Sequence, residues 1–101
     1  MITQKEIHDL AVAKGFWDEY RSDGECIALM HSELSECLEA FRHGDPLDEH
    51  IPSFNNAVVE LADCVIRIKD FCEGKGWDLE AAEAAKHEYN KTRPYKHGKE
   101  F

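Results

Sequence analysis

The stretch from Val58 to Phe71 constrains the fold most, because it is apolar around most of a helical circumference. When the stretch is wound as a helix at about 100° per residue, apolar side chains cover most of its surface and little of that surface suits contact with water. Such a helix needs other helices around it. Glu60, Asp63 and Arg67 nevertheless share one narrow strip of the same helix. Carboxylates on a buried helix are costly unless they are paired or bound to a cation, so this strip is the first candidate for a functional site.

The length and charge of the chain limit the classes of protein to consider. Its 101 residues predict one domain, 1–101, that can bury roughly 65% of its unfolded surface, enough for a core. The chain has 21 acidic and 12 basic residues, a net charge of −9. Such a surface repels nucleic acid and anionic lipid, so we expect neither nucleic acid nor a membrane as partner. No secretory leader and no membrane-spanning run is visible, so the expected location is cytoplasmic.

Four cysteines, at positions 26, 37, 64 and 72, fall among helical apolar positions, and none forms a C-x-x-C pair. Cysteines in this setting are typical of small buried side chains in a reducing compartment. A zinc site is the weaker alternative, because His31 and His43 neighbour Cys37 in the chain.

The first half of the chain predicts two helices. Thr3 followed by Glu6 matches a capping box, and apolar residues keep helical spacing after it. Asp23-Gly24 is expected to form the turn that separates the two helices. Gly44 is expected to end the second helix, since glycine commonly terminates helices. The expected helices span about residues 4–20 and 25–43.

The second half predicts two more helices and no strand. Ser53 is the expected N-cap of a helix over residues 54–73, and Asp78 that of a helix over residues 79–92. Residues 93–101 form a short basic tail. The predicted fold class is therefore all-α, a four-helix bundle. One short chain leaves the apolar central helix under-covered, which predicts a homo-oligomer that packs through its helices.

Two pairs of carboxylates have the spacing of a metal site. Glu33-x-x-Glu36 and Glu60-x-x-Asp63 lie on neighbouring helices that a short loop makes antiparallel. Each pair shares one helix face, so the four carboxylates can meet across the seam between the helices. Their mutual repulsion calls for a hard divalent cation such as Mg²⁺ or Mn²⁺. The alternative is that the carboxylates are solvated, or that Arg67, four residues after Asp63 and seven after Glu60, pairs with those two.

The last predicted helix carries a complementary strip of polar residues. Lys86, Asn90 and Arg93 lie at positions i, i+4 and i+7, on one face. An ammonium, an amide and a guanidinium in a row suit phosphate oxygens and a sugar or base edge. The alternative is that the two cations only complement the dipole at the helix C-terminus.

These motifs, taken together, resemble the MazG-type all-α nucleoside triphosphate pyrophosphohydrolases. The resemblance rests on E-x-x-E, then E-x-x-D, then K-x-x-x-N-x-x-R on successive helices, and it covers about residues 25–101. The ending, YNKTRPYKHGKEF over residues 89–101, is similar to that of short single-domain members. The resemblance implies an all-α fold that forms dimers or tetramers.

The resemblance also implies an activity. It is the Mg²⁺-dependent hydrolysis of an NTP or dNTP to the monophosphate and pyrophosphate, with Mn²⁺ as a substitute metal. Some relatives carry an extra glutamate beside the first pair, where this chain has Ser32 and Ser35, which leaves the general base open. The metal-binding and catalytic residues would be Glu33, Glu36, Glu60 and Asp63, and the phosphate contacts Lys86, Asn90 and Arg93. Separately from the resemblance, aromatic side chains commonly contact bases, which makes Phe16, Trp17 and His31 candidates for this role.

Three other interpretations stay open at this point. The chain can be a non-catalytic acidic helical module that binds a partner protein, in which case divalent metals would not stabilise it. It can also be a phosphoribosyl-ATP pyrophosphohydrolase-like enzyme, a helical relative. A di-iron carboxylate bundle is less favoured, because such bundles use Glu-x-x-His pairs and the four carboxylates here include no histidine.

Overall fold

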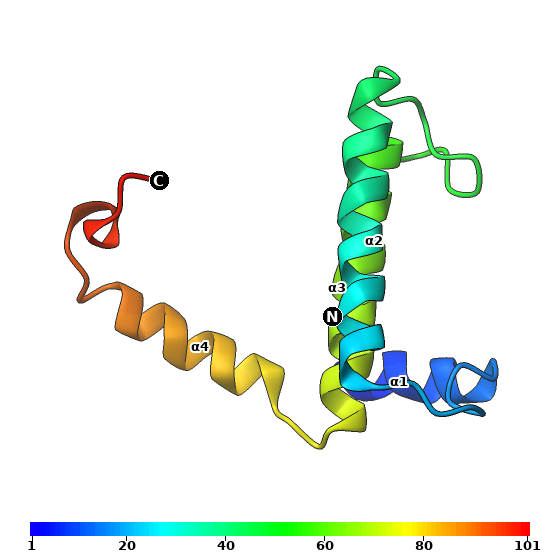
Figure 1. Cartoon of the computed structure of the whole chain (residues 1–101), viewed down its shortest axis with the longest axis horizontal. Coiled ribbons are helices and arrows are strands. Elements are labelled where there is room, and N and C mark those ends of the chain that lie inside the picture. The colour runs from blue at the N-terminus through cyan, green and yellow to red at the C-terminus, as the bar shows by residue number, and fades with distance from the viewer.

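A computed structural model describes residues 1–101 and contains four α-helices and no β-strand (Figure 1). This confirms the all-α class. The long helices α2 and α3 run antiparallel side by side, α1 packs across one end of α3, and α4 projects away from all three. The helices are α1 (Gln4–Ala13), α2 (Asp23–Arg42), α3 (Asn56–Gly74) and α4 (Leu79–Asn90), followed by a short 3-10 helix, η1 (Tyr95–Gly98).

Helix α1 begins where its cap predicts but ends early. The Thr3 hydroxyl oxygen accepts a hydrogen bond from the backbone N–H of Glu6, as the capping box predicts. The helix stops at Ala13 instead of reaching residue 20. Gly15 adopts φ +89°, a left-handed conformation that ends a helix and turns the chain. The expected bounds of this helix were therefore wrong at the C-terminal end.

Helix α2 begins earlier than expected, because its cap lies one residue before the predicted break. Ser22 and Glu25 form a reciprocal capping box. Asp23 and Gly24 consequently occupy the first turn and do not separate two helices, which corrects the prediction. The helix ends before Gly44, whose φ of +79° confirms it as a terminator.

The loop between α2 and α3 positions the start of α3. The expected cap, Ser53, lies outside the helix, and Asn55 at the N-cap makes no capping bond with its side chain. Asp45 takes over this role, since its Oδ1 accepts a hydrogen bond of 2.8 Å from the backbone N–H of Ala57. The Asn55 amide in turn donates to the Asp45 carbonyl oxygen at 2.9 Å. The loop is thereby tied to the helix that carries Glu60.

A polar clamp fixes α1 and the loop after it to the C-terminal half of α3. One Asp70 oxygen lies 2.9 Å from both His8 Nδ1 and Trp17 Nε1. The Trp17 ring lies so close to Gly74 that a Cβ at that position would collide with it. Glycine is therefore required at position 74 for a packing reason, and Trp17 serves as an anchor of the fold.

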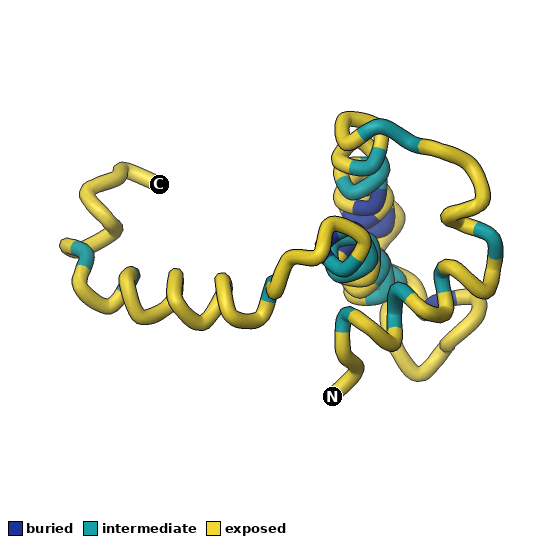
Figure 2. Tube along the Cα trace, turned by 90° about the horizontal axis from the view of Figure 1, so that it is seen from below, coloured by how far each residue is buried: buried dark blue, intermediate teal, exposed yellow.

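The core of a single chain is much smaller than its length predicts. Only seven of 101 residues are buried, and no large side chain is fully buried (Figure 2). The expectation of a sizeable core within one chain was therefore wrong. Helices α2 and α3 leave several large apolar side chains exposed to solvent. These are Leu34, Leu38, Phe41, Val58, Leu61 and Val65.

The fourth helix departs from the bundle expected from the sequence. Asp78 caps α4 as predicted, through a hydrogen bond from the backbone N–H of Ala81. The helix has no buried residue and extends away from α2 and α3 (Figures 1 and 2). Three packed helices and a projecting arm therefore replace a four-helix bundle within one chain. None of the helices is long and apolar enough to cross a membrane.

Candidate metal centre

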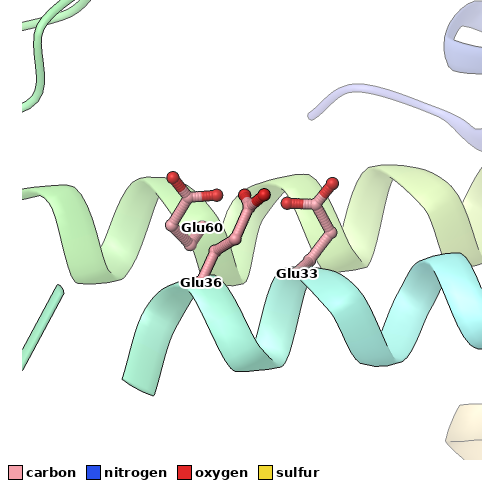
Figure 3. A group of neighbouring side chains, drawn as sticks. All are labelled: Glu33, Glu36 and Glu60. Atoms are coloured by element: carbon pink, nitrogen blue, oxygen red, sulfur yellow. The ribbon is translucent and has the colours of Figure 1, made fainter. Parts of the chain in front are cut away.

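Three of the four predicted carboxylates meet across the seam between α2 and α3. Glu33 and Glu36 come from α2 and Glu60 comes from α3, and their carboxylate groups point to the same side of the helix pair (Figure 3). One oxygen of each residue lies within 4.8 Å of the other two. The i, i+3 spacing on α2 and the antiparallel pairing with α3 bring them together, as the sequence predicts. We call these three residues the carboxylate cluster.

Two oxygens of the carboxylate cluster are buried without a partner. Glu33 is only 7% exposed, and neither its Oε2 nor the Oε2 of Glu60 accepts a hydrogen bond. An unpartnered buried carboxylate oxygen is among the costlier groups in a protein. A divalent cation prefers oxygen ligands, and one oxygen from each of the three glutamates lies close enough to the others to share one. The residues present therefore fit a hard metal ion, because the donors are carboxylate oxygens and two of them have no hydrogen-bond partner.

The other carboxylate oxygen of Glu33 and that of Glu60 each accept a hydrogen bond. Arg67 Nε donates to Glu33 Oε1 at 2.8 Å. The Asn56 amide donates to Glu60 Oε1 at 3.2 Å and to Asp48 Oδ1 at 3.1 Å. These contacts fix the orientation of the Glu33 and Glu60 carboxylates and leave their Oε2 atoms free. The sequence suggested Asp63 or Glu60 as the partner of Arg67, and the structure pairs Arg67 with Glu33.

The surroundings raise the pKa of two carboxyl groups on α3, that of Glu60 in the cluster and that of Asp63 beside it. Burial and the neighbouring Glu36 carboxyl raise the pKa of Glu60 to about 7. Burial and the negative charge of Glu33 also raise the pKa of Asp63 above its ordinary value. Both shifts have the causes expected of carboxylates held close together in partly dry surroundings.

The metal-free protein should become less stable as the pH rises from about 4.5 to about 7. In that interval the folded chain keeps a proton on Glu60 that the unfolded chain has already lost. The stabilising contribution is therefore fully present below about pH 4.5 and lost above about pH 7. Urea unfolding in the presence of EDTA between about pH 5 and pH 8 would measure it. A free energy of unfolding that rises through this interval would contradict the prediction.

The other predicted site residues lie outside the carboxylate cluster. Asp63 is one turn further along α3, beside the cluster but not within its closest group. Lys86 and Asn90 lie on α4, and Arg93 follows it, so the projecting arm separates all three from the cluster of the same chain (Figure 1). The structure brings together three of the four acidic residues and leaves the basic strip apart.

A groove of about 540 Å³ runs beside the cluster, between α1 and α3. Glu33 and Asp63 line the end nearest the cluster, and Phe16 adds an aromatic side chain. Three cations also line it, Lys14, Arg21 and Arg67. Four carboxylates line it as well, those of Glu6, Glu33, Asp63 and Asp70. Pockets that hold small molecules commonly join apolar walls to a few charged groups, and this groove combines an aromatic side chain with charges of both signs.

Two residues that support the site were not identified from the sequence. Asn56 orients Glu60, and Asp48 orients Asn56 while accepting bonds from the backbone N–H groups of His50 and Ile51. Asn56 lies four residues before Glu60, on the same helix face. That spacing was the available signal. Asp48 offered none, because it comes from a loop whose path the sequence does not specify.

Comparisons with protein-family models, with curated proteins and with solved structures find no match for this chain. The functional interpretation therefore depends on the motifs of the sequence and on the geometry of the carboxylate cluster and the groove.

Proposed function

We propose that the protein is a Mg²⁺-dependent nucleoside triphosphate pyrophosphohydrolase of the MazG-like type, which releases the monophosphate and pyrophosphate. The observation that carries this proposal is the pair of buried, unpartnered oxygens on Glu33 and Glu60, within a cluster completed by Glu36. Such a cluster suits a divalent metal, and divalent metals suit phosphate oxygens.

Each part of the site has a place in this proposal. Glu33, Glu36 and Glu60 would hold the metal, and Asp63 stands beside them. The metal, when bound, would neutralise charge on the phosphates and polarise a phosphoryl oxygen. Arg67 holds Glu33 in position through their 2.8 Å bond. Glu36 is the exposed member of the cluster, so we assign it to accept the proton of the attacking water.

The groove supplies the recognition of substrate in this proposal. Lys14 and Arg21 provide positive charge for the phosphates, and Phe16 offers a face on which a base can stack. The groove adjoins the cluster, because Glu33 belongs to the cluster and also lines the groove. A nucleotide in the groove would therefore present its phosphates to the carboxylates.

The proposal includes a homo-oligomer in the cytoplasm. The large apolar side chains exposed on α2 and α3 support self-association, because a second copy would cover them. The four cysteines form no disulfide, which suits a reducing compartment.

The proposal predicts metal-dependent pyrophosphate release from at least one of the common NTPs and dNTPs. Each would be incubated with the protein and Mg²⁺, with Mn²⁺ in place of Mg²⁺, and with EDTA. Release that EDTA abolishes would establish the reaction and name the preferred base and sugar. Phosphoribosyl-ATP belongs in the panel as the competing substrate. An absence of release across the whole panel, with no stabilisation by metal, would favour a helical module that binds a partner protein.

A further inference from the structure

The starting observation is the position of Arg67, between the carboxylate cluster and the groove. Its Nε donates to Glu33 Oε1 at 2.8 Å, and its side chain also lines the groove of about 540 Å³. Of the three cations that line the groove, Arg67 is the one that pairs with a member of the cluster. Arg21 donates instead to the backbone, from its Nη2 to the Phe16 carbonyl oxygen at 2.7 Å. Arg67 therefore brings positive charge to the place where the groove meets the cluster.

Most of the hydrogen-bonding capacity of Arg67 is unused. A guanidinium group has five N–H donors. The bond to Glu33 uses the donor on Nε, and the structure shows no hydrogen bond or ion pair from Nη1 or Nη2. The side chain is 34% exposed, and neither of these two nitrogens is buried. Four donors of Arg67 therefore remain for a ligand.

Arg67 has two further carboxylates nearby and pairs with neither of them. Asp63 lies four residues before it on α3, and Asp70 lines the same groove. Burial and the negative charge of Glu33 raise the pKa of Asp63, and the positive charge of Arg67 partly opposes that rise. The charge of Arg67 thus acts on the edge of the cluster, although its only ion pair is the one with Glu33.

The bond between Arg67 and Glu33 leaves Glu33 able to bind a metal. Arg67 occupies Oε1, whereas Oε2 is buried and has no hydrogen-bond partner. The Glu33 carboxylate can therefore accept from Arg67 and still offer an oxygen to a cation. A phosphate at the junction of groove and cluster would meet the guanidinium of Arg67 without displacing Glu33.

We propose that Arg67, besides positioning Glu33, binds a phosphate of the triphosphate chain through its Nη1 and Nη2 groups, at the place where the groove meets the carboxylate cluster. The identity of this ligand rests on the proposed function. The shape of the guanidinium suits the role, because two parallel N–H groups can donate to two oxygens of one phosphate. A lysine at this position would keep the charge but lack the paired donors.

Calorimetric titration with inorganic tripolyphosphate tests the contact whatever base the substrate carries. At saturating Mg²⁺, Arg67→Lys should bind tripolyphosphate about tenfold more weakly than the wild type, because the paired donors are lost. Its affinity for Mn²⁺ alone should change less than about threefold, since an ammonium group still balances Glu33. A residue that only positions Glu33 would give the opposite pattern, a weaker metal site with unchanged tripolyphosphate binding at saturating metal. That pattern, or equal tripolyphosphate affinities, would overturn the proposal.

The matched control is Arg42→Lys. Arg42 also pairs with a glutamate of α2, since its Nη1 lies 3.4 Å from Glu39 Oε2, but both side chains are exposed and neither lines the groove. This variant should bind tripolyphosphate and Mn²⁺ as the wild type does. A tenfold loss in the control as well would overturn the proposal, because the effect would then not be specific to Arg67.

A second measurement uses the wild-type chain and does not depend on the folding of a variant. Phenylglyoxal modifies accessible guanidinium groups, and mass spectrometry gives the rate of modification at each arginine. Tripolyphosphate with Mg²⁺ should slow the modification of Arg67 about tenfold and leave that of Arg42 unchanged. Equal rates at Arg67 with and without tripolyphosphate would overturn the proposal.

The phosphate contact and the proposed function fail in different ways. Protection of Arg67 in a protein that releases no pyrophosphate from any nucleotide would support the contact and contradict the hydrolysis. Pyrophosphate release by a protein whose Arg67→Lys variant binds tripolyphosphate as tightly as the wild type would support the hydrolysis and contradict the contact.

Discussion

Glu36→Gln is expected to lower metal-dependent pyrophosphate release by about 100-fold or more and to leave the fold intact. Glutamine keeps the size of the side chain but loses the charge that balances a divalent cation. Glu36 is exposed, and no hydrogen bond or ion pair of its carboxylate holds the structure together. Its loss should therefore affect the reaction without a comparable loss of stability. The measurement is the initial rate with saturating Mg²⁺ and the best substrate of the panel.

The matched control for this variant is Glu39→Gln. Glu39 lies on the same helix, one turn further, and pairs only with Arg42 and His43 at the surface. Exposed ion pairs contribute little to stability, so this variant should keep both the fold and the rate. Equal losses in the two variants would point to a general effect of charge, and a fully active Glu36→Gln would remove Glu36 from the site. Glu33→Gln should also abolish turnover, although it breaks the ion pair with Arg67 as well.

Mn²⁺ is expected to raise the melting temperature by roughly 10 to 20 °C when its concentration is about 100 times its dissociation constant. Binding of that strength adds about 2.7 kcal/mol to the free energy of unfolding, and a chain of this size gains roughly 4 to 8 °C for each kcal/mol. The physical source is the repulsion among the three carboxylates, which a cation relieves. A melting temperature that does not respond to Mn²⁺ would contradict a metal site of any kind.

Glu60→Gln tests the same site in a second way. It should raise the melting temperature without metal and remove most of the increase that Mn²⁺ gives the wild type. Without metal the variant should melt higher than the wild type near pH 8, since it removes a charge that burial and Glu36 oppose. With Mn²⁺ it should gain little, since one ligand is missing. It should also lose the part of the fall in stability from about pH 4.5 to about pH 7 that Glu60 contributes. A variant that melts lower without metal would indicate that the Glu60 carboxylate stabilises the fold.

The sequence predicted the helices well because their periodicity is strong, and the errors have local causes. Helix α1 was predicted too long, since Gly15 adopts a left-handed conformation and Trp17 anchors to Asp70 and Gly74. A regular spacing of apolar residues does not reveal that one of them has become a tertiary anchor.

The carboxylate cluster was the most predictable part of the site. Spacing of three along each helix fixes a common face, and a short loop favours the antiparallel pairing, so Glu33, Glu36 and Glu60 were expected to be neighbours. The same argument also predicted Asp63, which lies outside the cluster. The partner of Arg67 was not predictable in this way. Several carboxylates lay within its reach, and the selection of Glu33 depends on side-chain rotamers and on packing.

The position of α4 was beyond what a single sequence can specify. A pattern of polar and apolar residues shows which face of a helix will be covered, but it does not say which copy of the chain covers it. The sequence also does not say which copy of the chain covers the exposed apolar residues of α2 and α3. A bundle within one chain and a bundle shared between chains have the same pattern.

The small number of buried residues has a consequence for the amount of folded protein in a cell. In the proposed homo-oligomer, with only seven buried residues in each chain, contact between chains would supply much of the free energy of folding. Folding is then governed by mass action. The folded fraction rises with the total concentration, and dilution shifts the balance toward unfolded monomers that proteases degrade. Active protein would therefore increase more steeply than its rate of synthesis, so that low expression yields almost none and moderate expression yields a stable pool.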